Sequence, residues 1–402
     1  MCSEQPLEVP LNSPTTSPSG SQLPIPTSET SRRLDELFDE VAARRGIHSA
    51  VLAVESLDRS FRWSGAKGVA DADGSPMQEN TPFFIASIDK LITAVVVMKL
   101  HEQDKLDLRA PISTYLPAEL LSGLHTVDDQ DRTGEITVTH LLSHTSGLAS
   151  YVEDRPKGGN SLFESIVSEK DRSVSLEEAA RIIREDLKPH FPPQPLDDPR
   201  PRIRYSDTNF ALLRGIIRNV TGRPLPETFK TMVFEPIGLA QTWMVEHNPA
   251  QNGMNSPATV WAGDNPLDIP AALASLDAIY STVHDLNQFM RALSTGQLFE
   301  SSATFELMQA RWTRFGFPRD PAAARAPSWP IEYGLGIKRL QLPRLLTGFR
   351  RLPAVFGHSG STGTWAFVCP DLDVVISGAL NQTSAGALPY RLLPRILTTL
   401  VR

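Results

Sequence analysis

Strand-forming and helix-forming segments are distributed unevenly along this chain, and that distribution limits the folds open to it. Near the N-terminus, residues 49–56 (SAVLAVES) and 61–71 (FRWSGAKGVAD) flank the short turn LDRS and favour an antiparallel β-hairpin. Four more strand-like runs come near the other end: 333–342 (YGLGIKRLQL), 353–360 (PAVFGHSG), 363–370 (GTWAFVCP) and 372–382 (LDVVISGALNQ). We therefore expect an α/β (α+β) fold in which both ends build one antiparallel sheet flanked by helices.

The middle of the chain has the apolar spacing of helices. Capped or glycine-terminated helical patterns cover 28–46, 175–186, 209–222 and 281–293, and a last helix runs through 389–401 despite its internal proline. We expect a sheet lobe of residues 29–110 and 325–402 and an inserted all-helical lobe of residues 111–324. Pockets favour such boundaries, so we expect the active site between the lobes.

The first 28 residues differ from the rest in composition. They are rich in proline, serine and threonine and poor in apolar side chains, so we expect residues 1–28 to be a disordered tail. The tail lacks the basic stretch followed by an apolar stretch that marks a secretory signal. The longest apolar run nearby, residues 91–98, is far short of the ~20 residues that span a bilayer. We therefore expect a soluble, cytoplasmic protein with no membrane span.

The charge and the cysteine content argue against a nucleic-acid-binding protein and against a disulfide-rich protein. The net charge is −7 and no dense basic run occurs, which argues against a nucleic acid partner. Cys2 lies in the polar tail and Cys369 in an apolar run, so no disulfide framework is indicated. We expect no cofactor and no metal, and the sequence leaves the oligomeric state open.

The segment FIASIDKLITAVVVMKL places Ser87 and Lys90 three residues apart at the head of an apolar helix. Such residues share one helix face, and Ser87 would lie where the helix dipole stabilises a developing oxyanion. Ser64 and Lys67 have the same spacing, but in a strand they would point to opposite faces, so we take that pair as a coincidence. Taken alone, Ser87 can equally be a helix cap and Lys90 a snorkelling surface lysine.

A serine activated by lysine needs a further proton-handling group, because free lysine has a pKa of ~10.4 and is protonated at neutral pH. Burial lowers that pKa, and a nearby tyrosine can share the proton. Tyr205, in RYSDTNFALLRG, follows a proline-rich loop, precedes a helix and has an acidic residue, Asp207, two positions later. Alternatively, Asp207 simply caps that helix and Tyr205 packs beneath it.

A third segment, VFGHSGSTGTWAF, joins two strand-like runs through His358, Ser359 and Gly360. Gly360 would allow a substrate backbone to lie close to the strand. The amide of Ser361 could donate to an oxyanion. By itself, the segment is equally a hairpin with a surface histidine.

In this order and in these local structures, the three segments resemble the serine β-lactamase-like superfamily: class C β-lactamases, D-alanyl-D-alanine carboxypeptidases and family VIII esterases. Its members carry Ser-x-x-Lys, then Tyr-x-Asn or Ser-Asp-Asn, then His-x-Gly or Lys-Thr-Gly. The segments HLLSHTSGL, YSTVHDLNQF and YGLGI agree, and the resemblance covers about residues 31 to 402. It implies a β-lactamase/transpeptidase-like fold.

The resemblance also implies roles for individual residues. Ser87 would be the nucleophile and Lys90 the base that activates it. Tyr205 would pass the proton to the leaving group and help to activate the deacylating water. The amides of Ser87 and Ser361 would form the oxyanion hole, and Gly360 would lie beside the substrate.

Two positions depart from the family pattern. Asp207 stands where a neutral asparagine usually meets the substrate amide, and His358 stands where β-lactamases usually have the lysine that attracts a carboxylate. Both residues are predicted to contact the substrate. These departures favour a neutral carboxylic ester, lactone or amide, and we expect a serine hydrolase of the carboxylesterase type that acts through an acyl-enzyme.

Several other assignments fit parts of the sequence. Gly357–Ser361 has the pattern of an α/β-hydrolase nucleophile elbow, but a strand-like run follows it and no histidine occurs after His358. His140 and His144 lie four apart, but the glutamate of a His-Glu-x-x-His zinc site is missing. An acyltransferase, a D-amino-acid carboxypeptidase or β-lactamase of the same fold, and a non-catalytic scaffold or ligand-binding relative remain open.

Overall fold

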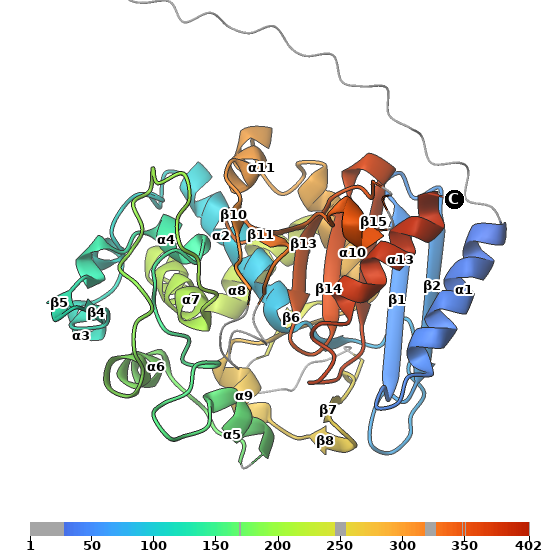
Figure 1. The fold of residues 1–402 in the computed structure, drawn as a ribbon, viewed down its shortest axis with the longest axis horizontal. Helices are drawn as coiled ribbons and strands as arrows, with labels where there is room; N and C mark the ends of the chain where they lie inside the picture. Colours follow the sequence, from blue (N-terminus) through green and yellow to red (C-terminus); the bar gives the residue numbers. More distant parts are fainter. Residues whose placement is uncertain are drawn as a thin grey trace, which may run out of the picture.

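A computed structural model describes residues 28–168, 170–245, 255–317, 327–347, 349 and 351–401. The described residues form an eight-stranded sheet in which every neighbouring pair is antiparallel (Figure 1). The spatial order is β10 (Thr313–Arg314), β11 (Ile331–Tyr333), β12 (Lys338–Leu340), β13 (Val355–Gly360), β14 (Thr364–Cys369), β15 (Val374–Ala379), β1 (Ser49–Ser56) and β2 (Arg62–Gly68). The two ends of the chain meet at the β15–β1 pair, which confirms the predicted antiparallel sheet built from both.

Most strand predictions are confirmed, but one predicted strand is two. β1 pairs with β2 as the expected hairpin. The run 333–342 is divided between β11 and β12, because the chain turns at Gly336 with a φ of 74°. A Cβ at Gly336 would lie 2.1 Å from the Cβ of Ala94 in α2 (Asp89–Glu102), so glycine also allows this turn to approach α2.

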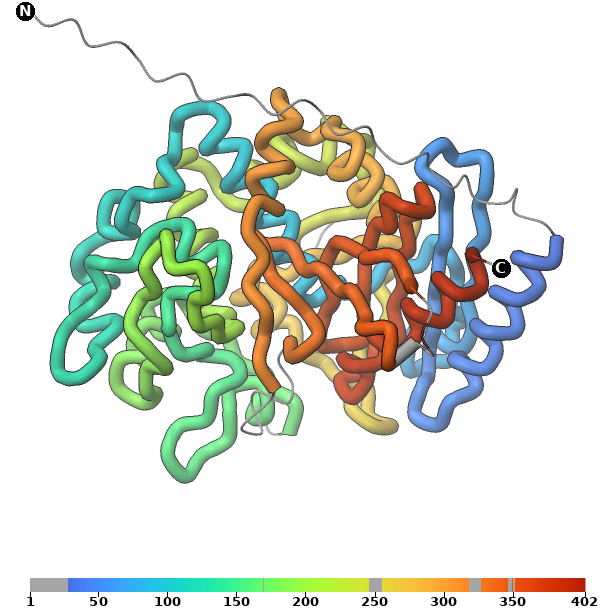
Figure 2. The backbone as a smooth tube through the Cα atoms, turned by 45° about the horizontal axis from the view of Figure 1, so that its top comes forward, coloured from blue at the N-terminus to red at the C-terminus, as the bar shows by residue number. Residues whose placement is uncertain are grey.

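Helices cover both faces of the sheet. On one face, α1 (Ser28–Ala42) packs beside α13 (Pro389–Val401), as Figure 2 shows for the two ends of the described chain. On the other face, α10 (Val283–Ser294) packs against β1, β14 and β15. Side chains alternate along β1, so Leu52 belongs to the first apolar layer and Val51 to the second.

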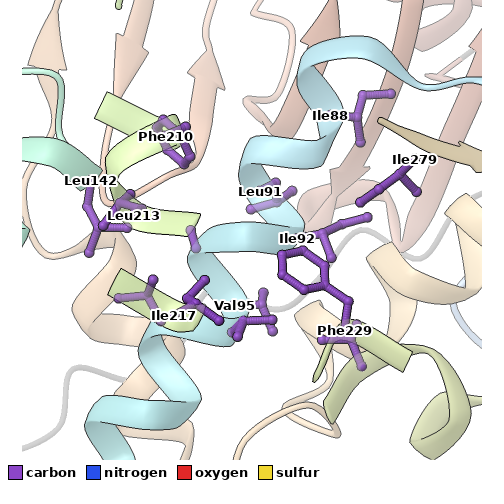
Figure 3. Close-up of a cluster of buried hydrophobic side chains, with 14 of the residues drawn as sticks. Ile88, Leu91, Ile92, Val95, Leu142, Phe210, Leu213, Ile217, Phe229 and Ile279 are labelled. Atoms are coloured by element: carbon purple, nitrogen blue, oxygen red, sulfur yellow. The ribbon is translucent and has the colours of Figure 1, made fainter. Parts of the chain in front are cut away.

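The apolar core behind the second face is built largely on α2 and α7 (Asp207–Thr221), which contact each other. In Figure 3, Val95 of α2 lies between Ile217 of α7 and Phe229, whereas Ile92 lies beside Phe229 and Ile279. Helix α2 is apolar all round, and most of its residues are buried. Its first turn, with Lys90, is therefore held inside the protein. That burial removes the snorkelling interpretation of Lys90.

The helical part lies to the side of the sheet (Figure 1). Its elements are α3 (Ala118–Leu121), α4 (Val138–Leu142), α5 (Leu162–Ser168), α6 (Leu176–Arg181), α8 (Leu225–Phe229) and α9 (Pro270–Ser275), with α11 (Ser302–Gln309) near the sheet edge. Small sheets are β3 (Phe83–Phe84) with β9 (Ile279–Ser281) and β6 (Trp243–Met244), β4 (Thr126–Val127) with β5 (Gln130–Asp131), and β7 (Val260–Ala262) with β8 (Asn265–Leu267).

Helix caps follow the predicted chemistry. The Ser175 side chain accepts a hydrogen bond from the amide of Glu178, and α7 ends at Gly222 with a φ of 64°. Helix α6 is shorter than predicted, because the chain continues beyond Arg181 as a π-helical turn, Ile182–Asp186.

Two sequence predictions stay untested. The disordered tail, residues 1–28, falls almost entirely on positions 1–27, outside the described residues; Ser28 begins α1. The lobe boundaries at 110/111 and 324/325 also stay predictions, although β10 and α10, from the range assigned to the helical lobe, belong to the sheet layer. Among the described residues, no helix has the length and apolar character needed to cross a membrane.

Candidate active site

Ser87 lies on a 3-10 turn, η1 (Ala86–Ile88), between β3 and α2. Ala86 has a φ of 47°, a conformation that non-glycine residues rarely adopt and that tends to occur at functional sites. The turn is fastened to the sheet, because the Thr364 hydroxyl donates to the Ile85 carbonyl over 2.9 Å. Ser87 is therefore not an ordinary helix cap but the middle residue of a constrained turn.

Gly360 is needed where this turn meets β13. A Cβ at Gly360 would lie 2.6 Å from the Ala86 Cβ and 2.9 Å from the Ile85 carbonyl oxygen. The glycine thus allows the Ser87 turn to pack on the strand. Its predicted role beside a substrate backbone stays a prediction, although Gly360 and Ser361 both line the same cavity as Ser87.

Lys90 is buried, and its ammonium group lies between Ser87 and two carboxylates. The Nζ atom donates to the Ser87 Oγ over 3.3 Å and lies 2.8 Å from an Asp207 oxygen and 3.8 Å from an Asp89 oxygen. Burial alone would lower the lysine pKa, but attraction to Asp207 and Asp89 outweighs it, and the pKa of Lys90 is raised. The expectation that burial would neutralise Lys90 is therefore wrong, because the Asp207 carboxylate keeps the group charged.

Asp207 is the first residue of α7 and not its cap, since Ser206 occupies the N-cap position. Besides Lys90, it accepts a hydrogen bond from the Ser150 hydroxyl over 2.9 Å. Asp89 in turn accepts from Arg214 over 2.5 Å, and Arg214 also donates to the Leu276 carbonyl. Two buried cations and two carboxylates are thus combined into one network whose formal charges cancel.

Tyr205 is buried beside this network. Its ring centroid lies 5.5 Å from the Lys90 Nζ, and the Lys338 Nζ lies at the same distance. Burial, followed by the negative charge of Asp207, raises the pKa of the phenol well above 10 despite an opposing contribution from the Ser87 hydroxyl. Within the described part of the chain, the phenol oxygen has no hydrogen-bond partner of standard geometry. Because its pKa is raised, the phenol keeps its proton at neutral pH and can donate it to the reacting groups.

A second lysine, not predicted as a site residue, completes the wall of the site. The Lys338 Nζ, from β12, donates to the carbonyl oxygen and hydroxyl of Ser359 over 3.2 and 3.1 Å, and to the Tyr390 hydroxyl over 3.3 Å. Ser359 and Tyr390 also hydrogen-bond to each other. Burial and repulsion by Lys90 lower the pKa of Lys338 well below its usual value.

His358 lies behind the site rather than in its wall. It is fully buried, hydrogen-bonded to the Tyr333 hydroxyl over 3.1 Å, and separated by 6.4 Å from the Tyr205 ring centroid. It is not among the residues that line the cavity, whereas its neighbour Ser359 is. Burial and two nearby lysines lower the pKa of His358 well below 6.5. Its predicted contact with the substrate stays a prediction that this position does not favour.

The cavity that contains the site has a volume of about 750 Å³. Its polar wall is formed by residues of the serine, lysine and tyrosine network, namely Ser87, Asp89, Lys90, Tyr205, Asp207, Arg214, Lys338, Ser359, Gly360, Ser361 and Tyr390. The remaining wall is mainly apolar and includes Phe84, Phe163, Ile166, Val260, Leu267, Ile269, Leu273, Leu276, Trp329, Ile331, Leu340 and Leu342. A convergent polar wall opposite a broad apolar one is typical of small-molecule sites.

The two histidines considered as metal ligands have structural partners. His140 forms a capping box with Thr137 at the start of α4. The His144 ring bonds to Asn209 and to the Ser206 amide. In the described ranges, no cluster of three or more His, Cys, Asp or Glu side chains could hold a metal ion.

A serine, a lysine and a tyrosine thus converge on one cavity, an arrangement of the β-lactamase type. The Beta-lactamase family model matches residues 34–397, and the chain belongs to this family. The recognised superfamily and the predicted β-lactamase-like fold are thereby confirmed.

Individual relatives are distant. Esterase EstB from Burkholderia gladioli is 29% identical over 225 residues, which are 54% of this chain and 52% of that protein. The solved structure of D-amino acid amidase from Ochrobactrum anthropi SV3 with D-phenylalanine gives a TM-score of 0.71 at 19% identity, over 92% of this chain and 99% of that one. EstCE1, described as a hydrolase with promiscuous acyltransferase activity, gives 0.66 at 19% identity over 93% and 99%. The chain spans about half the length of the curated relatives it matches.

Proposed function

We propose that this protein is a serine hydrolase that forms an acyl-enzyme on Ser87 and acts on carboxylic esters, with lactones and amides as related substrates. The observation that carries the proposal is the 3.3 Å contact between the Lys90 Nζ and the Ser87 Oγ, at the wall of a mainly apolar cavity. Family membership and the likeness to EstB support it.

Each group has a task in this reaction. Ser87 attacks the ester carbonyl, and the amides of Ser87 and Ser361 hold the oxyanion. Lys90 donates to the Ser87 oxygen, so the serine proton points away from Lys90, and Tyr205 is the group assigned to receive it. Tyr205 relays that proton and later returns it to the leaving alcohol.

A neutral ester suits the charges of the site. Asp207 is engaged by Lys90 and Ser150, so it presents no free group to a substrate amide. His358 is buried behind the wall and offers no charge to a substrate carboxylate. Both features disfavour efficient β-lactamase or D-amino-acid carboxypeptidase activity.

A second candidate is acyl transfer to an alcohol or amine instead of water. EstCE1, which has the same fold, is described with such an activity. A large apolar cavity favours transfer, since it can hold an organic acceptor and exclude water. The cytoplasmic location expected from the sequence also stays a proposal.

The proposal is tested with p-nitrophenyl acetate and p-nitrophenyl butyrate beside a chromogenic cephalosporin. We expect ester turnover that disappears in Ser87→Ala and survives in Ser64→Ala, the serine of the coincidental motif. Cephalosporin turnover far above ester turnover would show that β-lactams, and not esters, are the preferred substrates. An added alcohol that yields a new ester at the expense of free acid would identify the transferase.

A further inference from the structure

We infer that His144 is a positioning residue that holds Tyr205 in place beside Ser87. The inference rests on the proposed acyl-enzyme function and adds to it a group that does not touch the substrate. The His144 side chain is fully buried and is not among the residues that line the cavity. Its contribution to the reaction must therefore pass through its neighbours.

His144 is hydrogen-bonded to the chain on both sides of Tyr205. The amide of Arg204 donates to the His144 carbonyl oxygen over 3.0 Å, and the amide of Ser206 donates to the His144 Nδ1 over 3.2 Å. The imidazole also packs on the Tyr205 ring, with 4.4 Å between the two centroids. One residue thus fixes both the backbone and the ring of the tyrosine.

The backbone of His144 has the conformation that this double contact needs. Its φ is 57°, in the left-handed region that few residues other than glycine adopt and in which histidine is enriched. In this conformation the carbonyl and the ring of one residue both reach the segment 204–206. Such backbone conformations persist where the surroundings enforce them, and they cluster at functional sites.

Only one form of the imidazole fits these contacts. A backbone amide can only donate, so the Ser206 amide requires an unprotonated Nδ1. The Asn209 amide group donates to the same nitrogen over 2.9 Å, because the Asn209 oxygen accepts from the Ser146 hydroxyl over 2.7 Å. The ring proton therefore lies on Nε2. Burial and the charges of two lysines lower the pKa of His144 well below 6.5, which agrees with a neutral ring.

Tyr205 depends on this support. Its phenol oxygen has no hydrogen-bond partner of standard geometry among the described residues, so the backbone and the ring packing set its direction. On its other side, the His144 ring packs on Tyr333 at 4.8 Å, and the Tyr333 hydroxyl is hydrogen-bonded to His358 over 3.1 Å. A displacement of about 1 Å at a reacting group can cost roughly 10²-fold in rate.

The leaving group distinguishes this positioning role from a general structural role. Tyr205 is assigned to return a proton to the leaving alcohol, and the ethoxide of ethyl butyrate needs that proton, whereas p-nitrophenolate leaves without one. A displaced Tyr205 should therefore slow ethyl butyrate more than p-nitrophenyl butyrate. A protein that is merely less stable would lose both activities by the same factor.

The test compares kcat and KM for the two butyrate esters in variants of the full chain. His144→Phe keeps a ring but removes the acceptor of the Ser206 amide. We expect kcat for ethyl butyrate to fall ~10²-fold, with a much smaller loss for the p-nitrophenyl ester and little change in KM. His125→Phe is the matched control, because His125 is also buried, bonds to the Phe191 carbonyl and does not line the cavity. It should keep the wild-type ratio of the two rates.

Combination with Tyr205→Phe gives a second, independent measure. If His144 acts through Tyr205, His144→Phe should add almost nothing to the loss in Tyr205→Phe, because residues that act as one unit are strongly non-additive. Losses that multiply, or a wild-type ratio of the two esters in folded His144→Phe, would overturn the inference and leave the proposed function intact. Absence of turnover of both esters by the wild type would overturn the proposed function itself.

If His144→Phe does not fold, Asn209→Asp decides with the same two esters. The carboxylate would attract a proton to the His144 Nδ1, and the Ser206 amide would lose its acceptor, so we expect the same selective loss on ethyl butyrate. Nitrogen NMR of the wild-type protein tests the ring directly. We expect the His144 proton on Nε2 at neutral pH, and a proton on Nδ1 would overturn the inference.

Discussion

Replacing Lys90 by methionine should destabilise the protein as well as slow it, because the lysine neutralises a buried carboxylate. The Lys90 and Asp207 side chains are only 7% and 16% exposed. Breaking a buried ion pair by removing one partner costs about 3–5 kcal/mol. Asp207 keeps the Ser150 hydroxyl and lies at the positive end of α7, so we expect the lower part of that range, about 3 kcal/mol.

A second substitution should restore much of the stability that Lys90→Met loses. Asp207→Asn removes the unpaired charge, so Lys90→Met/Asp207→Asn should be more stable than Lys90→Met alone by about 1–3 kcal/mol. Asp207→Asn by itself leaves Lys90 with Asp89 at 3.8 Å and should destabilise the protein least of these three variants. Lys67→Met is the matched control, because Lys67 pairs with Asp39 at the surface and its loss should matter little.

The assay is thermal unfolding of the four variants and the wild type at pH 7, followed by near-ultraviolet circular dichroism. The expected order of melting temperature, from highest to lowest, is wild type and Lys67→Met, then Asp207→Asn, then the double variant, then Lys90→Met. Lys90→Met that melts with Lys67→Met, or a double variant no better than Lys90→Met, would refute the assignment of Lys90 as a paired cation.

Three further outcomes are expected. Gly360→Ala should abolish most acylation, because a Cβ at this position would lie 2.6 Å from the Ala86 Cβ. Gly134→Ala is the control, since a Cβ there would meet open space and the acylation rate should not change. Equal acylation rates in the two variants would refute the packing role of Gly360. Burial would raise the pKa of Asp154, but His190 and Arg204 lower it to about 2. The ionised Asp154 therefore stabilises the folded protein above its unfolded pKa of about 3.9, and this stabilisation is lost as the pH falls through about 2. The free energy of unfolding of Asp154→Asn should therefore depend less steeply on pH in acid than that of the wild type. An unchanged dependence would contradict the stabilising contacts of Asp154 with His190 and Arg204. Leu273→Trp should slow long-chain p-nitrophenyl esters more than the acetate, since Leu273 lines the cavity; a uniform effect would place the acyl chain elsewhere.

The pattern of apolar residues in the sequence predicted much of the fold. Continuous apolar runs located β1, β14 and β15, whose residues are all buried because helices cover both faces of the sheet there. The edge strand β2 is partly exposed and was located from the predicted hairpin with β1. The division of residues 333–342 into β11 and β12 was missed, since it depends on how closely Gly336 approaches α2. That contact lies between segments distant in the chain.

The site was predictable only where its residues are close in sequence or share a motif. Ser87, on the turn before α2, and Lys90, in the first turn of α2, lie 3.3 Å apart, and Tyr205 lines the same cavity. The spacing of Asp207 could not reveal that its carboxylate would meet Lys90 and keep it charged.

Lys338 and Tyr390 were missed for the same physical reason. They reach the site from β12 and α13, elements that the sheet topology brings together. A lysine within the apolar run GLGIKRL was the one available signal for Lys338, because an ammonium in such a run must find partners or lose its proton.

The covalent intermediate on Ser87 can be observed directly. The protein is mixed with p-nitrophenyl butyrate, quenched in acid within the first turnover, and analysed as intact protein and as proteolytic peptides by mass spectrometry. We predict one added butyryl group, located on the peptide that contains Ser87, in the wild type and in Ser64→Ala but not in Ser87→Ala. Release of p-nitrophenol by wild-type protein that never carries the acyl group, or that carries it on another residue, would contradict catalysis through Ser87.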